Sequence, residues 1–422
     1  MTTDEIIAAM LERVAVPAPV SQPLAECRDC LLASSVIASA NLPHRSIASR
    51  DGYALRAADV ATASASSPIR LPIVGEIAPG ESVPAALPAG CAVRVLTGAP
   101  LPAGADAVVR TEDAHVQLPL GMQNYVDILL PAASGQFVAL VGSEFAAGAT
   151  ALHAGLTLGP AELAALAALG LTHAAVIPRP RVAIVVSGTE LRRKSADSEL
   201  PQLYASNGVL VSAMVQACGG VAQSVRIVSD DPAELAQALQ SAMSADLIVT
   251  TGGTGRGSRD VIGKVLQERE VSSMWDLKVS GSRPAAFRML RQDSAERVIA
   301  HLALPGRPVA AMLAFALFAC PLLRRLSGRP PRKAQYLRAR LAAMPEGAHK
   351  SQRFFPVRLR YRESAWEAVP TGDASLYGLA AAIGAHGFAL LGQARVRPEG
   401  WRLVRVLLPP WQEMIGRDAR SA

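Results

Sequence analysis

Asp246-Leu247-Ile248-Val249-Thr250-Thr251-Gly252-Gly253 indicates the class of fold, because this segment joins an apolar strand directly to a glycine-rich turn. On both sides of it, strand-like apolar segments alternate with segments of helical periodicity across residues 177–328. This alternation predicts a parallel sheet with helices on both faces, whose ligands bind beyond the carboxyl ends of the strands. The predicted strands are 181–187, 225–228, 246–250 and 298–304, and the predicted helices are 209–218, 232–243, 261–268 and 308–323.

The rest of the chain differs in its patterns. Residues 1–46 show helical periodicity broken by prolines, with 31–40 as the second helix. Short β segments between prolines and glycines then predict a compact all-β region over 47–145. A helix is expected over 157–171, capped by Thr157, started by Pro160 and ended by Gly170. Beyond residue 329 the strands 355–361 and 403–408 indicate a C-terminal β domain.

Composition restricts the class of protein. At 422 residues the chain is too long for one ordinary core, so we expect about three or four domains. Hydrophobic residues make up 50% and charged residues 18%, which excludes wholesale disorder. The net charge of +7 comes mainly from arginine, a bias typical of genome composition, so we do not take it to indicate nucleic-acid binding. The basic block over 324–362 is interpreted as a solvated surface or as a face toward an anionic ligand.

The termini and cysteines indicate the compartment. Residues 1–5 are acidic and lack the basic and apolar regions of a signal peptide. The longest apolar run, 309–323, is too short to span a bilayer and predicts a buried helix. Five scattered cysteines favour a reducing compartment. Cys27 and Cys30 have metal-ligand or redox spacing, but without a second pair a shared helix face is the simpler interpretation. We therefore expect a cytoplasmic protein without a membrane segment.

The predicted α/β strands end in loops that carry reactive or binding residues. Glycines in these loops allow backbone N–H groups to approach a phosphate or a flat heterocycle closely. Arg307 adds positive charge where the next helix begins. Glu190, Asp230 and Asp260 are hard oxygen ligands that suit a Mg²⁺ ion bridging to substrate phosphate. The loops are 187–190, 229–231, 251–260 and 304–308.

Each loop also has an ordinary structural interpretation. A glycine pair often forms a tight turn, and the two aspartates before Pro232 are candidates for a helix cap. Asp260 is another candidate cap, and Glu190 is then a surface acid. Four such loops at successive strand ends of one sheet nevertheless favour a site. The seven histidines show neither a catalytic triad nor a metal pair at helical spacing, which argues against zinc.

Two motifs of the β region complete the pattern. They are Arg50-Asp51-Gly52-Tyr53-Ala54 and the run 94–100, Arg-Val-Leu-Thr-Gly-Ala-Pro, which is followed by Gly-Ala-Asp-Ala-Val-Val at 104–109. Together with the glycine-rich turn at Gly252, these two motifs are typical of parts of a single anion-binding site. On these segments, and on Leu158–Leu171, Ser187–Leu191, Ser206-Asn207, Asp230–Pro232 and Leu304–Gly306, the chain resembles the molybdopterin molybdenumtransferases, the MoeA and gephyrin E-domain family.

The resemblance implies a multi-domain α/β and β architecture. Residues 1–46 and 146–176 would form an elongated N-terminal linker and dimerisation domain, and 47–145 the inserted small β domain. Residues 177–328 would form a MoaB/MogA-like three-layer α/β/α domain that binds molybdopterin, and 329–422 a C-terminal β-barrel. The family assembles as a domain-swapped homodimer, with each active site between the α/β domain of one subunit and the Asp51 domain of the other.

The implied activity is insertion of molybdate into adenylylated molybdopterin with release of AMP, assisted by Mg²⁺. Molybdenum-cofactor synthesis or acceptor proteins are the partners that this chemistry suggests. The catalytic positions would be Asp51, Thr97, Glu190 and Arg283, and the metal ligands Glu190, Asp230 and Asp260. The substrate-binding positions would be Ser187, Gly188, Gly252, Gly253, Lys278, Gly306 and Arg307.

This chain departs from the family pattern at the oxyanion loop. Where the family reads Lys-Pro-Gly-Lys-Pro, residues 280–284 are Ser-Gly-Ser-Arg-Pro, so Arg283 replaces one lysine and Ser280 the other. Arg307 stands in place of an asparagine and Ala310 in place of a serine. These departures leave two alternatives open. One is a diverged non-catalytic paralogue that binds and delivers molybdopterin or cofactor. The other is a hybrid that adenylylates molybdopterin, since residues 251–260 resemble the related adenylyltransferase.

Overall fold

The computed structural model describes residues 2–82, 86–117, 124–189, 191–192, 203–252, 261–272, 275–277, 285–292, 297–344, 354–372, 378–396 and 402–411. The chain forms two compact units. The first contains Met1–Val20, Asp29–Leu31 and Ile177–Ala422, and the second contains Ser21–Arg28 and Leu32–Val176. The N-terminal residues thus group with the α/β region, while the finer division into four domains stays a prediction.

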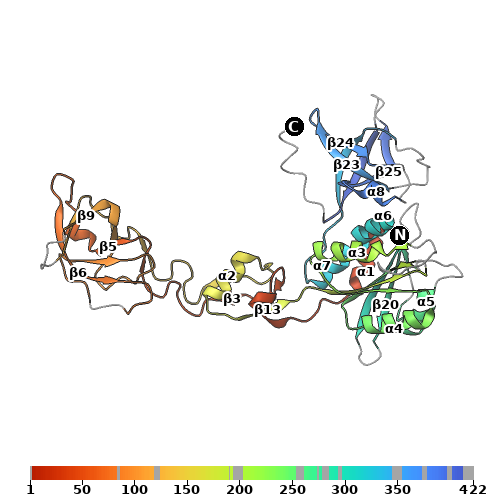
Figure 1. Cartoon of the computed structure of the whole chain (residues 1–422), viewed down its shortest axis with the longest axis horizontal. Coiled ribbons are helices and arrows are strands. Elements are labelled where there is room, and N and C mark those ends of the chain that lie inside the picture. The colour runs from red at the N-terminus through yellow and green to blue at the C-terminus, as the bar shows by residue number, and fades with distance from the viewer. Residues whose placement is uncertain are drawn as a thin grey trace. The chain divides into compact units, whose positions relative to one another are not determined.

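The sheet predicted over 177–328 is present (Figure 1). Its first four strands in spatial order are parallel, which confirms the prediction. The fifth strand pairs antiparallel with the fourth and the sixth antiparallel with the fifth, and neither was predicted. The order is β17 (Val221–Val228), β14 (Arg181–Ser187), β18 (Leu247–Thr251), β21 (Val298–Leu304), β20 (Ala285–Arg291) and β19 (Trp275–Leu277). A separate parallel pair joins β15 (Leu191–Arg192) to β16 (Leu203–Tyr204).

Helices cover both faces of this sheet, as the alternating pattern predicts. One core packs the sheet against the N-terminal helix and the helices that follow β16 and β21. The other packs its opposite face against the helices that follow β17 and β18. The first face carries α1 (Thr3–Glu12), α3 (Ser206–Ala217), α6 (Pro308–Ala314), a π turn (Phe315–Ala319) and α7 (Cys320–Leu326). The second carries α4 (Pro232–Ala242) and α5 (Val261–Leu266), followed by a 3-10 turn (Gln267–Arg269).

Among the described residues, one helix is long and apolar enough to cross a membrane. It spans Pro308–Leu326, 19 residues, and 83% of its apolar window is buried inside the structure. The helix is longer than the predicted run because the π turn joins α6 to α7 without a break. Pro321 follows the π turn by two residues, in the first turn of α7. Burial of this helix agrees with the prediction of a core element.

A closed barrel follows the α/β sheet in the same unit. Its apolar centre includes Ala339, Phe355, Val357, Val404 and Val406. Strands predicted at 355–361 and 403–408 are confirmed within it. The order around the barrel is β22 (Gln335–Leu341), β24 (Ala365–Pro370), β23 (Phe354–Arg362), β25 (Gly387–Val396) and β26 (Arg402–Leu408), with α8 (Leu379–Ala382) between β24 and β25 in sequence.

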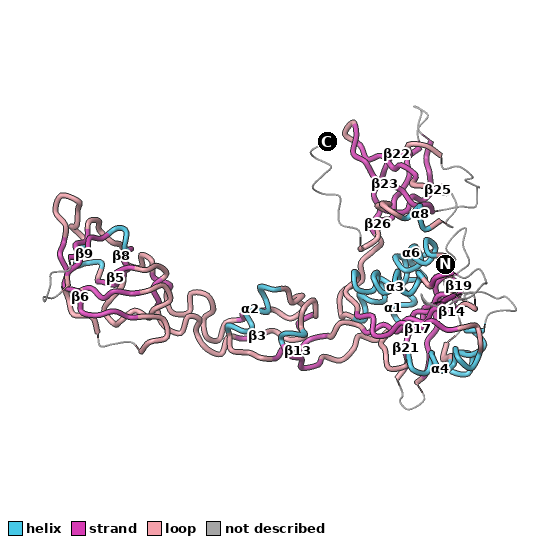
Figure 2. The backbone as a smooth tube through the Cα atoms, viewed as in Figure 1, coloured by secondary structure: helices cyan, strands magenta, loops and turns pink. Residues whose placement is uncertain are grey.

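The second unit contains the short β segments expected over 47–145 (Figure 2). Six strands form one sheet with apolar clusters that include Tyr53, Leu55, Val95 and Val108. The order is β8 (Ala107–Arg110), β5 (Gly52–Leu55), β7 (Ala92–Val95), β6 (Ile69–Ile77), β10 (Tyr125–Ile128) and β9 (Ala114–Gln117). The pair β4 (Ile47–Ala48) and β11 (Val138–Ala139) and the 3-10 turns Ala57–Val60 and Thr111–Asp113 complete this region.

The predicted helix over 31–40 is wrong. Long-range backbone bonds hold this segment extended: Leu32 N donates to Leu156 O at 2.8 Å and Ala38 N to Ala149 O at 2.9 Å. Local helical periodicity does not compete with these tertiary pairings. The strands are β2 (Leu31–Leu32) and β3 (Val36–Ile37), with β3 paired to β12 (Thr150–Leu152), and β2 in a sheet with β1 (Val20–Pro23) and β13 (His173–Ile177). A 3-10 turn, Leu24–Glu26, follows β1.

The predicted helix near 157–171 is confirmed as α2 (Pro160–Ala168), with a different cap. Gly159 is the N-cap residue, and its N–H donates to the Glu162 carboxylate at 2.9 Å, so the expected cap by Thr157 is wrong. Pro160 occupies the first turn as predicted. Gly170, with φ +81°, ends the helix, and Leu171 N donates back to Leu166 O.

Candidate functional site

In the second unit, Asp51 and Thr97 are held together by two hydrogen bonds. Asp51 immediately precedes β5, and Thr97 follows its neighbour β7, so pairing of these strands brings the residues together. The backbone N and the Oγ1 of Thr97 each donate to Asp51 Oδ1 at 2.7 Å. These bonds hold the pKa of the Asp51 carboxyl below its ordinary value, with a smaller contribution from Arg94. Both side chains are exposed, so an ionised, oriented carboxylate faces solvent.

Two glycines make this arrangement possible. A Cβ at Gly52 would lie 2.0 Å from the Val109 carbonyl oxygen, so close pairing of β5 and β8 excludes any side chain there. Gly98 has φ +88° and donates its N–H to Ala48 O at 2.8 Å, which closes the turn after Thr97. The Asp-Gly and Thr-Gly sequences therefore form one structural unit.

Asp106 has a structural part in the same sheet. Its Oδ1 accepts the Ala57 N–H at 2.7 Å, and its backbone N donates to Leu55 O at 3.0 Å. These bonds fix the chain just after β5. The 104–109 motif thus stabilises β5, which follows Asp51, and the Asp106 carboxylate is hydrogen-bonded to backbone.

In the first unit, three predicted positions come together at the carboxyl ends of adjacent strands. Gly252, at the end of β18, has φ +96° and donates its N–H to Leu304 O at 3.2 Å. A Cβ on Gly252 would lie 2.8 Å from the Ser187 carbonyl oxygen and 2.9 Å from Ser187 Oγ. A Cβ on Gly306 would lie 3.9 Å from the Gly252 Cα. Ser187 and Gly252 are therefore closely packed, and Gly306 lies in ordinary van der Waals contact beside Gly252; we call these three residues the glycine floor.

The two aspartates before α4 have different roles. Asp231 is the N-cap: its Oδ1 accepts the N–H groups of Ala233 and Glu234, both at 2.9 Å. Asp230 is exposed, and its Oδ2 accepts from Thr189 N at 3.4 Å and Thr189 Oγ1 at 3.3 Å. Of the two aspartates predicted as candidates for a helix cap, Asp231 is the cap. Asp230 instead contacts the 187–189 loop. Gly188 belongs to this loop through its N–H bond to Val228 O at 3.2 Å.

Arg307 and Ala310 mark the start of the long core helix. Arg307 is the exposed N-cap residue of α6, and Pro308 occupies the first turn. Ala310 is fully buried, so the position where the family carries a serine is part of the core in this chain.

Asn207 is a site residue that the predicted set omits. Its Nδ2 donates to Gly306 O at 2.7 Å, although the side chain is almost entirely buried. Among the described residues, neither the Asn207 Oδ1 nor the Thr251 Oγ1 has a hydrogen-bond partner, and both atoms are buried. These two buried oxygens beside the glycine floor are acceptors whose hydrogen bonds a bound ligand would supply. The sequence feature that could have identified Asn207 is the Ser206-Asn207 pair, which stands just before the predicted helix 209–218.

The remaining predicted positions, Glu190, Gly253, Asp260, Lys278 and Arg283, lie outside the described residues, as does Ser280. In the described part, no group of three or more His, Cys, Asp or Glu side chains is arranged to hold a metal ion. Mg²⁺ commonly binds through one or two carboxylates plus substrate phosphate, so the exposed Asp230 carboxylate is compatible with such an ion.

Cys27 and Cys30 do not lie on a regular α-helix. Cys27 ends a 3-10 turn, and its thiol donates to Pro23 O at 3.2 Å. Asp29 between them has φ +62°. Cys30 is buried, and this burial raises the pKa of its thiol. The expected shared helix face is therefore wrong, because the intervening residues leave the helical conformation.

Comparisons with known proteins agree with this architecture. The family model for the MoeA N-terminal region (domain I and II) matches residues 1–170, and that for a probable molybdopterin binding domain matches residues 183–325. Molybdopterin molybdenumtransferase 2 of Mycobacterium tuberculosis is 31% identical over 346 residues, which cover 79% of this chain and 82% of that protein. The molybdopterin molybdenumtransferase of Synechococcus elongatus is 31% identical over 362 residues, which cover 85% and 87%.

A solved structure extends the comparison to the fold. The molybdopterin biosynthesis MoeA protein of Pyrococcus horikoshii is 26% identical, with a TM-score of 0.70, and the match covers 97% of this chain and 98% of that one. The sequence match and the fold match both span most of the chain. The chain therefore belongs to the molybdopterin molybdenumtransferases and is a transferase of molybdenum cofactor biosynthesis.

Proposed function

We propose that this enzyme inserts molybdate into adenylylated molybdopterin and releases AMP, in a Mg²⁺-dependent reaction carried out by a cytoplasmic homodimer. The observation that carries this proposal is the convergence of Ser187, Gly252 and Gly306 at one sheet edge. Two glycines beside a small serine leave room for the close approach of a pterin or a phosphate to backbone groups. The names of the relatives support molybdopterin as the substrate class.

The described residues take distinct roles in this proposal. Asn207 holds Gly306 and offers its buried Oδ1 to a ring N–H of the bound pterin. Arg307 places a positive charge beside the same floor to bind an anionic group. Glu190, Gly253, Lys278 and Arg283 keep the catalytic and binding roles that the family pattern implies.

Asp230 would hold Mg²⁺ together with Glu190 and Asp260. The ion would supply charge neutralisation at the phosphoanhydride. Asp51 contributes a carboxylate that the Thr97 hydroxyl and backbone N–H orient, and this carboxylate would accept a hydrogen bond from the bound substrate. The Asp51 carboxyl is ionised at neutral pH even at its ordinary pKa, and its hydrogen bonds lower this pKa further, so it accepts hydrogen bonds and does not act as an acid.

The test is transfer activity of matched variants. Purified protein is mixed with adenylylated molybdopterin, molybdate and Mg²⁺, and molybdenum in the pterin is measured. Asp51→Asn should still bind the adenylylated pterin but lose transfer by about 100-fold or more, by analogy with the loss of an electrostatic catalytic group. Glu112→Gln removes the same charge from an exposed ion pair in the same unit and should behave like wild type.

Two outcomes would contradict the proposal. If Asp51→Asn transfers molybdenum as fast as wild type, the carboxylate has no part in the reaction. If wild-type protein binds the pterin tightly but transfers no molybdenum, cofactor delivery by a diverged paralogue is the better assignment. ATP-dependent formation of the adenylylated pterin would instead favour the hybrid activity.

A further inference from the structure

Two cysteines far apart in sequence meet between two helices of the first unit. Cys218 is the C-cap residue of α3, and Cys320 is the first residue of α7. They are 102 residues apart, yet their Sγ atoms lie 2.8 Å from each other. Both are free thiols. A disulfide bond is about 2.05 Å long, so a small shift brings the sulfurs to bonding distance.

We propose that Cys218 and Cys320 form an oxidisable dithiol that closes to a reversible disulfide between α3 and α7. Neither cysteine belongs to the predicted transferase site. The oxidant class is a small-molecule disulfide such as oxidised glutathione. The inference therefore does not depend on the proposed function.

The exposure of the two residues sets the order of steps. Cys218 is half-buried, whereas Cys320 is only 3% exposed. Burial, together with the neighbouring Cys218, raises the pKa of the Cys320 thiol. The thiolate is the nucleophile in thiol–disulfide exchange, so Cys218 is the thiol that attacks first. Its sulfur bonds to one sulfur of the oxidant, and the first small thiolate leaves.

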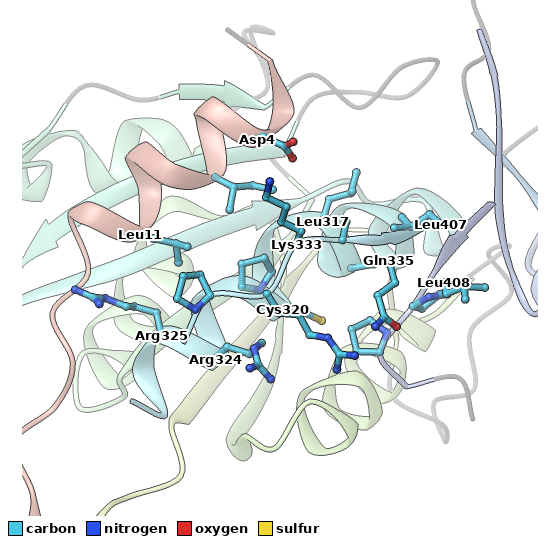
Figure 3. A pocket seen from close by; sticks show the side chains of 18 of the residues that line it. Asp4, Leu11, Leu317, Cys320, Arg324, Arg325, Lys333, Gln335, Leu407 and Leu408 are labelled. Carbon is cyan, nitrogen blue, oxygen red and sulfur yellow. The ribbon is translucent and has the colours of Figure 1, made fainter. Parts of the chain in front are cut away.

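Cys320 then resolves this mixed disulfide. Its proton passes to the departing thiolate, its sulfur bonds to the Cys218 sulfur, and the second small thiol is released. The protein loses two protons and two electrons, and the oxidant is reduced to two thiols. A cavity of about 840 Å³ lies beside the resolving cysteine and is lined by Cys320, Leu317, Arg324 and residues of α1 and β22 (Figure 3).

A bond at this position would join two helices that already meet near the glycine floor. Asn207 in the first turn of α3 donates to Gly306 O, two residues before α6 begins. α6 continues through the π turn into α7, which carries Cys320. The disulfide would therefore add a covalent link to a helix pair that is hydrogen-bonded at its other end.

The experiment uses the full-length protein and oxidised glutathione. After oxidation and alkylation, a non-reducing digest should contain one species that links the Cys218 peptide to the Cys320 peptide, and dithiothreitol should remove it. The thiols titrated in denaturant should fall by two. The melting temperature should rise by several degrees, because the link closes a long loop of the unfolded chain.

Variants separate the steps. Cys218→Ser should form no bridge and leave Cys320 unmodified, whereas Cys320→Ser should keep glutathione attached to Cys218. Cys320→Ala serves the same purpose if the serine variant folds poorly. Cys91→Ser, which changes a half-buried cysteine of the other unit, should bridge like wild type. The proposal is overturned if all five thiols remain, if glutathione stays on wild-type Cys218, or if the bridge joins other cysteines or two molecules.

Discussion

At the scale of single residues, the site depends on side chains brought together from distant parts of the sequence. Asp51 and Thr97 are 46 residues apart and share two hydrogen bonds of 2.7 Å. The sequence motifs identified both positions as functional, but not their mutual bonding. That bonding depends on the pairing of β5 with β7, which short-range patterns do not encode.

The Thr97 hydroxyl lowers the pKa of the Asp51 carboxyl. In Thr97→Val the side-chain hydrogen bond, which lowers the Asp51 pKa most, is lost, so this pKa should rise toward its ordinary value of 3.8. Thr97→Ser keeps the hydroxyl and should keep the pKa low. Carbon-13 NMR titration of the carboxyl measures both. A valine variant with the wild-type pKa would show that the backbone bond alone holds the carboxylate ionised.

Gly252 combines a positive φ with a close contact. In Gly252→Ala the new methyl would lie 2.8 Å from Ser187 O in a left-handed backbone conformation, which costs roughly 1–3 kcal/mol for the backbone alone. Gly219→Ala is the matched control, with φ +84° but an ordinary 3.5 Å contact to Arg329. We expect Gly252→Ala to lower the melting temperature more than Gly219→Ala and also to weaken pterin binding. Equal losses in both variants would indicate that only backbone strain matters.

At the scale of elements, the two aspartates before α4 differ in role: Asp231 caps the helix, and Asp230 is the candidate ligand. Asp231 caps the helix with two hydrogen bonds of 2.9 Å, so Asp231→Ala should cost about 0.5–2 kcal/mol of stability. Asp230→Asn should change stability little but reduce activity, because Asp230 is exposed beside the 187–189 loop. Thermal unfolding and transfer activity of the two variants provide the comparison. If Asp230→Asn lowered stability and Asp231→Ala lowered only activity, Asp230 would be the cap and Asp231 the ligand.

The sheet contains a buried histidine that should make it acid-sensitive. His301 on β21 accepts or donates a 3.0 Å bond with Thr250 Oγ1 on β18, and burial, followed by repulsion from Arg288, lowers its pKa to about 3. The unfolded chain binds this proton near pH 6.5, so the contribution of His301 is fully present above that pH and is lost as pH falls toward 3. His301→Gln should therefore flatten the loss of stability over this range. His153→Gln, an exposed control, should leave the wild-type profile unchanged.

Elements with strong periodic patterns were predictable, and those held by distant partners were not. The strands 181–187 and 298–304 match the bounds of β14 and β21 because apolar residues dominate both, although β21 contains His301. β17 begins four residues before its predicted start, since this half-exposed edge strand mixes polar with apolar residues. β20 was missed although most of it is buried, because Arg288 interrupts its apolar run.

At the scale of the whole molecule, the sequence predicted the fold class and the candidate site unequally. Ordered motifs from Asp51 to Gly306 predicted the family, which the comparisons confirm. The glycine floor follows from residues at successive strand ends, as expected for a parallel sheet. Asn207 was not predicted as a ligand, because its importance depends on burial beside Gly306, a property that only the packed helix pair creates.

Molybdenum insertion coupled to AMP release can be measured in a single-turnover reaction in which AMP and pterin-bound molybdenum are quantified together. Wild-type protein with adenylylated molybdopterin, molybdate and Mg²⁺ should yield equal amounts of both products. Omission of molybdate should abolish molybdenum incorporation and slow AMP release. Tight binding of the adenylylated pterin with neither AMP nor molybdenum incorporation above a protein-free control would contradict the account.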